Sequence, residues 1–218
     1  MYVKYLSHRL VLDKIAAESS YAENYERICS MKVMTILGSP KKNGNTAKVL
    51  GLFESMIACD HEVDRINIAD SDVKGCIGCY ACQQKPNEPG CVQKDDAMSI
   101  FERMMNSDVM VYASPLYCWS FSSQIKAFYD RHFCLVTGYD TPDYKSLLEG
   151  KRSALLVTCG GPVEDNADLI QTIFDRMNDF CKCSVIGKYV VPFCTTPDSI
   201  GPDATKIAER MAADVGVS

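Results

Sequence analysis

The sequence lacks a long hydrophobic run, an excess of basic residues and a good supply of histidine. No apolar run approaches the roughly 20 residues that a helix needs to span a bilayer, so we expect no membrane-spanning segment. The chain carries 23 Lys and Arg against 28 Asp and Glu, for a net charge of −5. This balance gives no electrostatic reason to expect nucleic acid or an anionic membrane as a partner. The three histidines, His8, His61 and His132, are scattered, so none is predicted to be catalytic.

The N-terminal residues also lack the apolar core of an export signal. Lys4, Arg9 and Asp13 interrupt any such core, so we expect a cytoplasmic protein. Twelve cysteines are many for 218 residues, and in a reducing compartment they are not expected to form a disulfide framework. The cysteines in apolar stretches are interpreted as small buried hydrophobic residues: Cys59, Cys134, Cys181 and Cys194.

Short apolar runs and amphipathic stretches alternate from Met31 onward. The runs predicted as strands are 33–37, 61–68, 109–113, 154–158 and 185–191, and the predicted helices are 46–58, 97–106, 122–136, 166–181 and 203–214. A long loop with little pattern, 69–94, interrupts the alternation. Strands that alternate with helices predict an α/β fold, a doubly wound parallel sheet with helices on both faces.

The first thirty residues differ in composition from the rest of the chain. Residues 2–17 carry an apolar stripe, but the stretch up to Ser30 is polar and has no clear period. We interpret residues 1–30 as an appended helical arm on a partner subunit or as a poorly ordered tail. No internal repeat, low-complexity tract or linker divides the remainder, so residues 31–218 are predicted to form a single domain.

The loop after the first predicted strand has the composition of an anion site. Its sequence is Gly38-Ser39-Pro40-Lys41-Lys42-Asn43-Gly44-Asn45-Thr46. It enters a helix whose first N–H groups face one point, and its lysines add positive charge. The loop matches neither Gly-x-Gly-x-x-Gly nor Gly-x-x-x-x-Gly-Lys, which argues against a dinucleotide or a triphosphate. A phosphomonoester fits better, and an ordinary capped Asn-Gly turn is the alternative.

Two further loops follow strands that should end at the same edge of the sheet. The first is Ser114-Pro115-Leu116-Tyr117-Cys118-Trp119-Ser120-Phe121-Ser122, which holds the only tryptophan of the chain. A flat heteroaromatic ring needs such an aromatic wall, with backbone donors at its edge. The second is Thr158-Cys159-Gly160-Gly161-Pro162, where the glycines let backbone N–H groups approach a ring edge. Because ligands of open parallel sheets bind beyond the strand ends, the loops predict one site; packed aromatics and a plain turn are the alternatives.

Together these loops resemble those of the flavodoxin-like family of NAD(P)H-dependent FMN reductases and iron–sulfur flavoproteins. The most specific matching pieces are Gly38-Ser39-Pro40 with Gly44-Asn45-Thr46, Ser114 to Tyr117, and Gln124 to Phe128 followed by Asp130-Arg131. The resemblance covers about residues 31–192 and implies a flavodoxin-like sheet of five strands in the order 2-1-3-4-5. The Asp130-Arg131 pair is interpreted as a structural ion pair rather than a catalytic one.

The resemblance implies FMN as the cofactor and NAD(P)H as a transient co-substrate. The residues that would hold the FMN phosphate are Ser39, Lys41, Asn43, Asn45 and Thr46. The residues that would hold the isoalloxazine ring are Pro115, Leu116, Tyr117, Cys118, Trp119, Cys159, Gly160 and Gly161. Relatives of this kind are usually dimers or tetramers, so the resemblance also implies a homodimer or homotetramer.

The long loop contains the pattern C-x2-C-x2-C-x8-C, formed by Cys76, Cys79, Cys82 and Cys91. Three thiolates at this spacing can converge on one face of a 4Fe–4S cluster, which a distant fourth completes. Iron–sulfur flavoproteins have a compact motif of this kind with a shorter final gap. Because the loop follows the second strand, we expect it to open at the flavin end of the sheet. Free thiols in a substrate-side or dimer-facing loop, and a tetrahedral zinc site, are the alternatives.

The predicted function is FMN-dependent oxidoreduction, with electrons passing from NAD(P)H through the flavin to a small-molecule or protein acceptor. The first alternative is a non-enzymatic iron–sulfur flavoprotein that relays single electrons between protein partners. The second is a flavin- or thiol-based redox sensor, which predicts reversible oxidation of Cys76, Cys79 or Cys82 with a change in partner binding.

Overall fold

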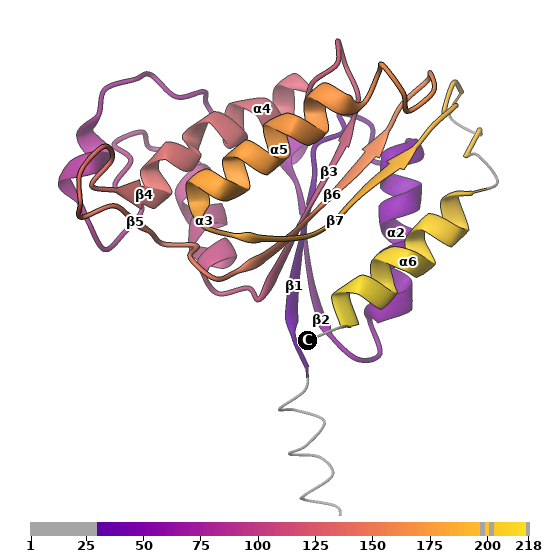
Figure 1. Ribbon diagram of the computed structural model, residues 1–218, viewed down its shortest axis with the longest axis horizontal. Coiled ribbons are helices and arrows are strands. Elements are labelled where there is room, and N and C mark those ends of the chain that lie inside the picture. Colours follow the sequence, from indigo (N-terminus) through magenta and orange to yellow (C-terminus); the bar gives the residue numbers. More distant parts are fainter. Residues whose placement is uncertain (1–29, 197–198, 201–202, 217–218) are drawn as a thin grey trace, which may run out of the picture.

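Five parallel strands form the central sheet, in the order β2-β1-β3-β6-β7 (Figure 1). Their bounds are β1 Lys32–Leu37, β2 Glu62–Asn67, β3 Val109–Pro115, β6 Arg152–Thr158 and β7 Ser184–Val191. Counted by themselves along the chain, these strands have the order 2-1-3-4-5, so the predicted doubly wound parallel sheet is confirmed.

The computed structural model describes residues 30–196, 199–200 and 203–216. The predicted arm or tail over residues 1–30 lies outside the described residues, apart from Ser30. The division of the chain at residue 30 therefore stays a prediction.

Helices cover both faces of the sheet (Figure 1). One face is covered by α2 (Asn45–Ile57) and α6 (Ala204–Gly216), and the other by α3 (Ala97–Met105), α4 (Ser123–Tyr129) and α5 (Asp168–Cys181). In the part of the chain that the structure describes, no helix is long and apolar enough to cross a membrane.

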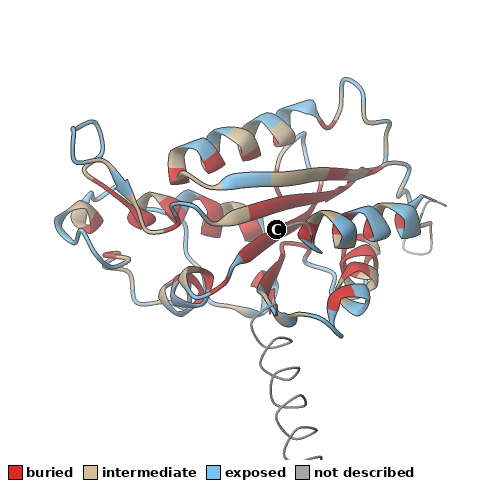
Figure 2. Cartoon of the chain, turned by 60° about the horizontal axis from the view of Figure 1, so that its bottom comes forward, coloured by how far each residue is buried: buried red, intermediate tan, exposed pale blue. Residues whose placement is uncertain are grey.

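The alternation of side chains along the strands divides the core into two layers. On β1, Val33 and Leu37 pack with α2 and α6, whereas Met34 and Ile36 pack with the three helices of the opposite face. Every residue of β3 is buried, as expected for a central strand that is covered on both sides. Figure 2 shows this buried centre, with exposed residues along the outer faces of the helices.

The end of β1 is fastened to the start of α4 through a glycine. The N–H of Gly38 donates to the carbonyl oxygen of Ala113 over 2.7 Å, and the hydroxyl of Ser122 donates to the carbonyl oxygen of Gly38. A Cβ on Gly38 would lie 2.6 Å from the Cβ of Ile125, so a larger residue there would displace α4. The loop after β1 and the start of α4 therefore hold each other in place.

The prediction of a continuous helix over residues 122–136 is wrong. After α4 the chain tightens into the 3-10 helix η3 (Asp130–Leu135), and Val136 begins a two-stranded hairpin. The hairpin strands are β4 (Val136–Thr137) and β5 (Lys145–Ser146). Four of the six η3 residues are buried, among them the polar residues Arg131 and His132.

The loop expected over residues 69–94 contains two short 3-10 segments, η1 (Ile68–Asp70) and η2 (Ala81–Gln84). Of the cysteines interpreted as buried hydrophobic residues, Cys134 and Cys181 are buried. The same interpretation is wrong for Cys59, which lies beyond the end of α2 and is exposed, and for Cys194, which is only partly buried.

Candidate functional site

A cavity of about 170 Å³ lies beyond the carboxyl ends of β1, β3, β6 and β7. The predicted site residues that line it are Ser39, Lys41, Asn45, Thr46, Pro115, Leu116, Tyr117, Cys159 and Gly160. They come from three loops that are far apart in the sequence, and the parallel sheet brings these loops to one edge.

The other predicted residues of this site lie outside the lining. Asn43 is exposed in the first loop, and Gly161 follows the lining residue Gly160. Cys118 and Trp119 form the tip of a tight turn and both have positive φ angles, 48° and 61°. The N–H groups of Tyr117 and Ser120 each donate to the other residue's carbonyl oxygen over 3.0 Å. Trp119 is 56% exposed and does not line the cavity.

The part of the cavity next to α2 favours an anion. Gly44 is the N-cap of α2, and the first turn of this helix carries no acidic residue. The first N–H groups of a helix have no intrahelical partner and lie at the positive end of the helix dipole. Lys41 adds its charge to this region, whereas Lys42 pairs with Asp70 over 2.6 Å and does not line the cavity.

Two polar contacts hold the wall of the cavity around α2. The hydroxyl groups of Thr46 and Thr158 are hydrogen-bonded over 2.6 Å, which joins the first turn of α2 to the last residue of β6. The side-chain N–H of Asn45 donates to the carbonyl oxygen of Thr196 over 2.7 Å. The amide oxygen of Asn45 is buried and has no hydrogen-bond partner among the described residues. A buried acceptor without a partner is costly, so this atom fits a site that a polar ligand completes.

The loop after β7 also lines the cavity, although no motif in its sequence marks it as part of a site. The lining residues that were not predicted as site residues are Gly44, Thr158, Cys194, Thr195 and Thr196. The rule that ligands bind at the carboxyl ends of strands, applied to the last strand as well, points to the threonines. Cys194 reaches the cavity because its N–H donates to the carbonyl oxygen of Cys159 over 2.8 Å. Burial and the neighbouring Cys194 raise the pKa of the Cys159 thiol, which therefore stays protonated at neutral pH.

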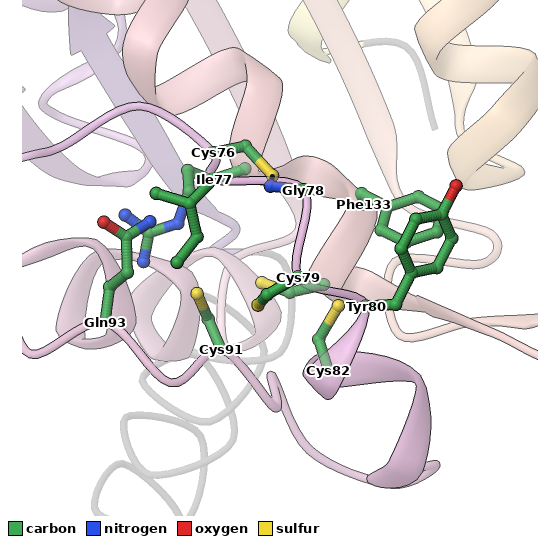
Figure 3. Close-up of a pocket in the computed structure, with 11 residues that line it drawn as sticks. Cys76, Ile77, Gly78, Cys79, Tyr80, Cys82, Cys91, Gln93 and Phe133 are labelled. Carbon is green, nitrogen blue, oxygen red and sulfur yellow. Dashed lines mark hydrogen bonds between the residues drawn. The ribbon is translucent and has the colours of Figure 1, made fainter.

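The four cysteines of the C-x2-C-x2-C-x8-C pattern line a second cavity, of about 220 Å³ (Figure 3). Its complete lining is Cys76, Ile77, Gly78, Cys79, Tyr80, Cys82, Cys91, Gln93, Arg131, Phe133 and Cys134. The last three residues belong to η3, so the unpredicted break after α4 builds one wall. The predicted cluster residues are thus brought together in one cavity, which also contains a fifth thiol, that of Cys134.

The segment before Cys91 folds back on itself, so the eight-residue gap does not separate this cysteine from the others. The side-chain N–H groups of Gln83 donate to the carbonyl oxygens of Phe133 and Val136, over 3.2 and 2.8 Å, and fasten η2 to the core. Gly90 then passes so close to η2 that a Cβ on it would lie 2.8 Å from the carbonyl oxygen of Cys82. This close approach brings Cys91 beside Cys82.

As they stand, the side chains of this cavity are not arranged as metal ligands. Among residues 30–196, 199–200 and 203–216, no group of three or more His, Cys, Asp or Glu residues is placed to hold a metal ion. Cys76 and Cys79 are exposed, so their side chains have room to rotate inward. Burial raises the pKa of Cys82, and burial with the neighbouring Cys91 and Cys82 raises that of Cys134 to about 12. A bound metal reverses this preference, because it stabilises the thiolate form.

A buried ion pair lies behind the cysteines. The side chains of Arg131 and Asp95 are 1% and 0% exposed, and they meet at two points, Nη1 to Oδ2 over 2.7 Å and Nη2 to Oδ1 over 3.2 Å. The sequence predicted an ion pair between Asp130 and Arg131, and this prediction is wrong, because Asp130 pairs with Lys126 over 2.5 Å. Its structural role is retained, with Asp95 as the partner of Arg131.

The two cavities are separate within one chain and share no lining residue. The strand-end loops adjoin the start of α4, whereas the cysteine cavity lies at η3, beyond its end. The seven residues of α4 span about 10 Å, and Figure 1 shows the cysteine loop at the left and the strand-end loops at the upper right. The expectation that the cysteine loop opens beside the strand-end loops is not met within one chain.

Comparison with protein families matches residues 31–195 to the NADPH-dependent FMN reductase family. An iron–sulfur flavoprotein from Archaeoglobus fulgidus is 29% identical over 188 residues, which cover 85% of this chain and 79% of that protein. An iron–sulfur flavoprotein from Methanosarcina thermophila is 34% identical over 149 residues, which cover 68% of this chain and 73% of that protein.

Solved structures show the same fold at lower sequence identity. An FMN-dependent NADH-azoreductase from Bacillus anthracis, in complex with FMN, has a TM-score of 0.62 and 16% identity, covering 85% of this chain and 99% of that one. An NAD(P)H:quinone oxidoreductase from Methanothermobacter marburgensis has a TM-score of 0.63 and 20% identity, covering 86% of this chain and 94% of that one. At these identities the likeness bears on the fold alone.

Proposed function

The chain belongs to the NADPH-dependent FMN reductase family, and from this membership we propose that it is an FMN-dependent oxidoreductase. It takes electrons from NAD(P)H and passes them to a small-molecule or protein acceptor. The observation that carries the proposal is the strand-end cavity, in which Lys41 and the start of α2 meet residues of three further strand-end loops. A flavin mononucleotide has the matching chemistry, a phosphomonoester joined to a flat ring.

In this proposal the first loop holds the FMN phosphate. Lys41 supplies the charge, and the hydroxyls of Ser39 and Thr46 lie in the lining beside the first N–H groups of α2. Asn45 offers its unpartnered amide oxygen to a hydroxyl group of the cofactor. Asn43, which is exposed, contacts the phosphate from the rim.

The other loops hold the ring. Pro115, Leu116, Tyr117, Cys159 and Gly160 line the cavity, while Cys118, Trp119 and Gly161 adjoin these residues in the sequence. When bound, FMN supplies the hydride and single-electron transfer that the side chains lack. The chain binds and orients the cofactor and excludes water from one side of it. The protonated thiol of Cys159 presents a neutral, weakly polar wall to the ring.

We propose further that Cys76, Cys79, Cys82 and Cys91 are the ligands of a 4Fe–4S cluster. Four thiols on one loop are the usual ligand set of such a cluster, and the cavity already gathers all of them. Two similar proteins are named iron–sulfur flavoproteins. A cluster would carry single electrons, so this cavity also favours the second candidate function, a non-enzymatic relay between protein partners.

A homodimer or homotetramer is part of the proposal. Because the two cavities lie apart in one chain, electrons would pass between them more directly across a contact between subunits. Large apolar side chains are exposed at both places. They are Ile77, Tyr80 and Val92 on the cysteine loop, and Tyr117, Trp119 and Phe193 on the strand-end loops. Exposed apolar groups of this kind are typical of protein contacts.

The experiment that separates the candidates is anaerobic reduction of the FMN-loaded protein. An oxidoreductase is bleached by NADPH or NADH alone and is then reoxidised, with turnover, by a quinone or an azo dye. A relay is not bleached by either nucleotide but is reduced by a ferredoxin. Iron and acid-labile sulfide, assayed on the same sample, test the cluster separately. A protein that takes up no FMN would contradict both candidates.

A further inference from the structure

One nitrogen of the Arg131 guanidinium, Nε, has no hydrogen-bond partner among the described residues. Nη1 donates to Asp95 Oδ2 over 2.7 Å and to the carbonyl oxygen of Lys74 over 2.8 Å, and Nη2 donates to Asp95 Oδ1 over 3.2 Å. The Nε–H donor is also buried. Such a donor is costly in a folded protein, and Arg131 lines the cysteine cavity.

The guanidinium cannot easily turn to find another partner. The carboxylate of Asp95, which binds it at two points, also accepts the N–H of Lys74 over 3.0 Å and the N–H of Ala97 over 3.2 Å. This carboxylate therefore ties the start of the cysteine loop, the start of α3 and the guanidinium to one another. The Nε–H group is held in place before any ligand arrives.

Sulfur atoms are the most numerous polar side-chain atoms in the cavity lining, where they belong to Cys76, Cys79, Cys82, Cys91 and Cys134. Cys91 and Cys134 line the same cavity as Arg131. An anionic, sulfur-rich occupant would therefore meet a fixed cationic donor.

We propose that Arg131 donates its Nε–H to a sulfur atom of the 4Fe–4S cluster and thereby raises the reduction potential of that cluster. The inference rests on the proposed cluster at Cys76, Cys79, Cys82 and Cys91. A hydrogen bond to a cluster sulfur stabilises the reduced form more than the oxidised form, because reduction adds negative charge to the sulfurs. Because the carboxylate of Asp95 balances the charge of the guanidinium, the rise in the reduction potential comes from the Nε–H group that points at the sulfur atom.

The test compares the wild-type protein with Arg131→Lys after anaerobic reconstitution with iron and sulfide. Lysine keeps the positive charge beside Asp95 but lacks the Nε–H. We expect equal iron and sulfide contents and a lower cluster potential in the variant. At a fixed solution potential the ratio of reduced to oxidised cluster should fall about tenfold, which corresponds to about 59 mV for one electron. The potential is read by redox titration with electron paramagnetic resonance.

The matched control is Arg103→Lys. Arg103 is also bound through two nitrogens to a carboxylate, that of Asp64, but it does not line the cavity. This control should leave the cluster potential unchanged. The double variant Arg131→Gln with Asp95→Asn removes both charges together. It replaces Arg131→Lys in the test if that variant does not fold. It too should keep the iron and lower the potential.

The outcomes distinguish the two proposals. A wild-type protein that binds no iron after reconstitution overturns the cluster proposal, and the role of Arg131 is lost with it. A wild-type protein with a full cluster, whose potential is the same in both Arg131 variants, overturns the role of Arg131 alone. Loss of iron in both Arg131 variants, with full iron in Arg103→Lys, overturns the effect on potential and shows that Arg131 only supports the loop.

Discussion

The guanidinium of Arg131 and the carboxylate of Asp95 form a two-point ion pair with almost no exposure to solvent. The pair connects η3 to the start of α3, and the carbonyl oxygen of Lys74 brings the cysteine loop into the same cluster. Removing one partner of a buried pair leaves the other charge uncompensated, which costs about 3–5 kcal/mol.

We expect Asp95→Ala to lower the free energy of unfolding by an amount in that range, measured by urea denaturation. The matched control is Asp64→Ala, which breaks the partly exposed pair with Arg103. Pairs near the surface contribute about 0–1 kcal/mol, so the control should change stability little. Equal losses in the two variants would contradict the central position given to Asp95.

The same pair predicts a loss of stability in acid. Although burial works in the opposite direction, the bonds from Arg131, Lys74 and Ala97 lower the pKa of Asp95 below its ordinary value. A lowered carboxyl pKa contributes stability that is present above the ordinary value, about 3.9, and is lost as the pH falls further. The stability difference between wild type and Asp95→Asn should therefore be constant above pH 5 and shrink below pH 4.

His132 predicts a second pH dependence, at higher pH. Burial lowers the pKa of His132 to about 4, although its contacts with Phe128 and Tyr129 oppose this. As the pH falls below about 6.5, the unfolded chain therefore binds a proton on this imidazole, whereas the folded chain binds it only near pH 4. The contribution of the neutral His132 side chain to the free energy of unfolding is complete above about pH 6.5. It falls by about 1.4 kcal/mol per pH unit between pH 6.5 and pH 4.

We expect His132→Gln to remove this slope. Glutamine retains an acceptor for the hydroxyl of Tyr112, which lies 2.8 Å from the imidazole Nε2. Between pH 7 and pH 4.5, wild type should lose about 2 kcal/mol relative to the variant. Tyr112→Phe retains the imidazole and should keep the wild-type slope. Parallel curves for wild type and His132→Gln would show that the imidazole does not titrate in this range.

The two adjacent lysines of the first loop separate a role in FMN binding from general surface charge. Lys41 lines the strand-end cavity, whereas Lys42 pairs with Asp70. Hydrogen bonds to charged groups contribute about 1.5–3 kcal/mol, so Lys41→Met should weaken FMN binding by roughly ten- to a hundredfold. Lys42→Met should change it little. Riboflavin, which lacks the phosphate, should bind wild type and Lys41→Met alike. Equal effects of the two substitutions on FMN would argue against the phosphate site.

Gly90 and Gly75 provide a matched test of the cysteine loop. A Cβ on Gly90 would lie 2.8 Å from the carbonyl oxygen of Cys82 and 2.7 Å from the Cβ of Lys85, but a Cβ on Gly75 would meet no described atom within 4 Å. Gly90→Ala should therefore displace Cys91 and reduce the iron bound on reconstitution. Gly75→Ala should keep the wild-type iron content. If both variants bind iron like wild type, the close approach at Gly90 does not position Cys91.

The sheet could be predicted from sequence because each strand is a short apolar run beside an amphipathic helix, as at residues 33–37 and 46–58. The break after Tyr129 could not, because η3 buries Arg131 and His132, and a local pattern treats these residues as a polar helix face. The partner of Arg131 lies 36 positions away in the sequence, so only tertiary structure reveals it.

The candidate site was predictable where a loop carries its own signal. Glycine and short polar residues mark residues 38–46, and aromatic residues mark 114–122. The loop after β7 has no such mark, since Thr196 gains its meaning only from its contact with Asn45, and Thr195 only from lining the cavity. Trp119 carries an aromatic signal too, but the turn gives it a positive φ, its side chain is exposed and it does not line the cavity, so its contact with the ring stays a prediction.

The most direct test of the central claim is a titration of the flavin-free protein with FMN, followed by flavin fluorescence and absorbance. We expect saturable binding of one FMN per chain, with loss of free-flavin fluorescence and weaker binding of riboflavin than of FMN. Addition of NADPH or NADH without oxygen should then bleach the bound flavin. No saturable FMN binding, or equal affinity for FMN and riboflavin, would contradict the assignment of the strand-end cavity.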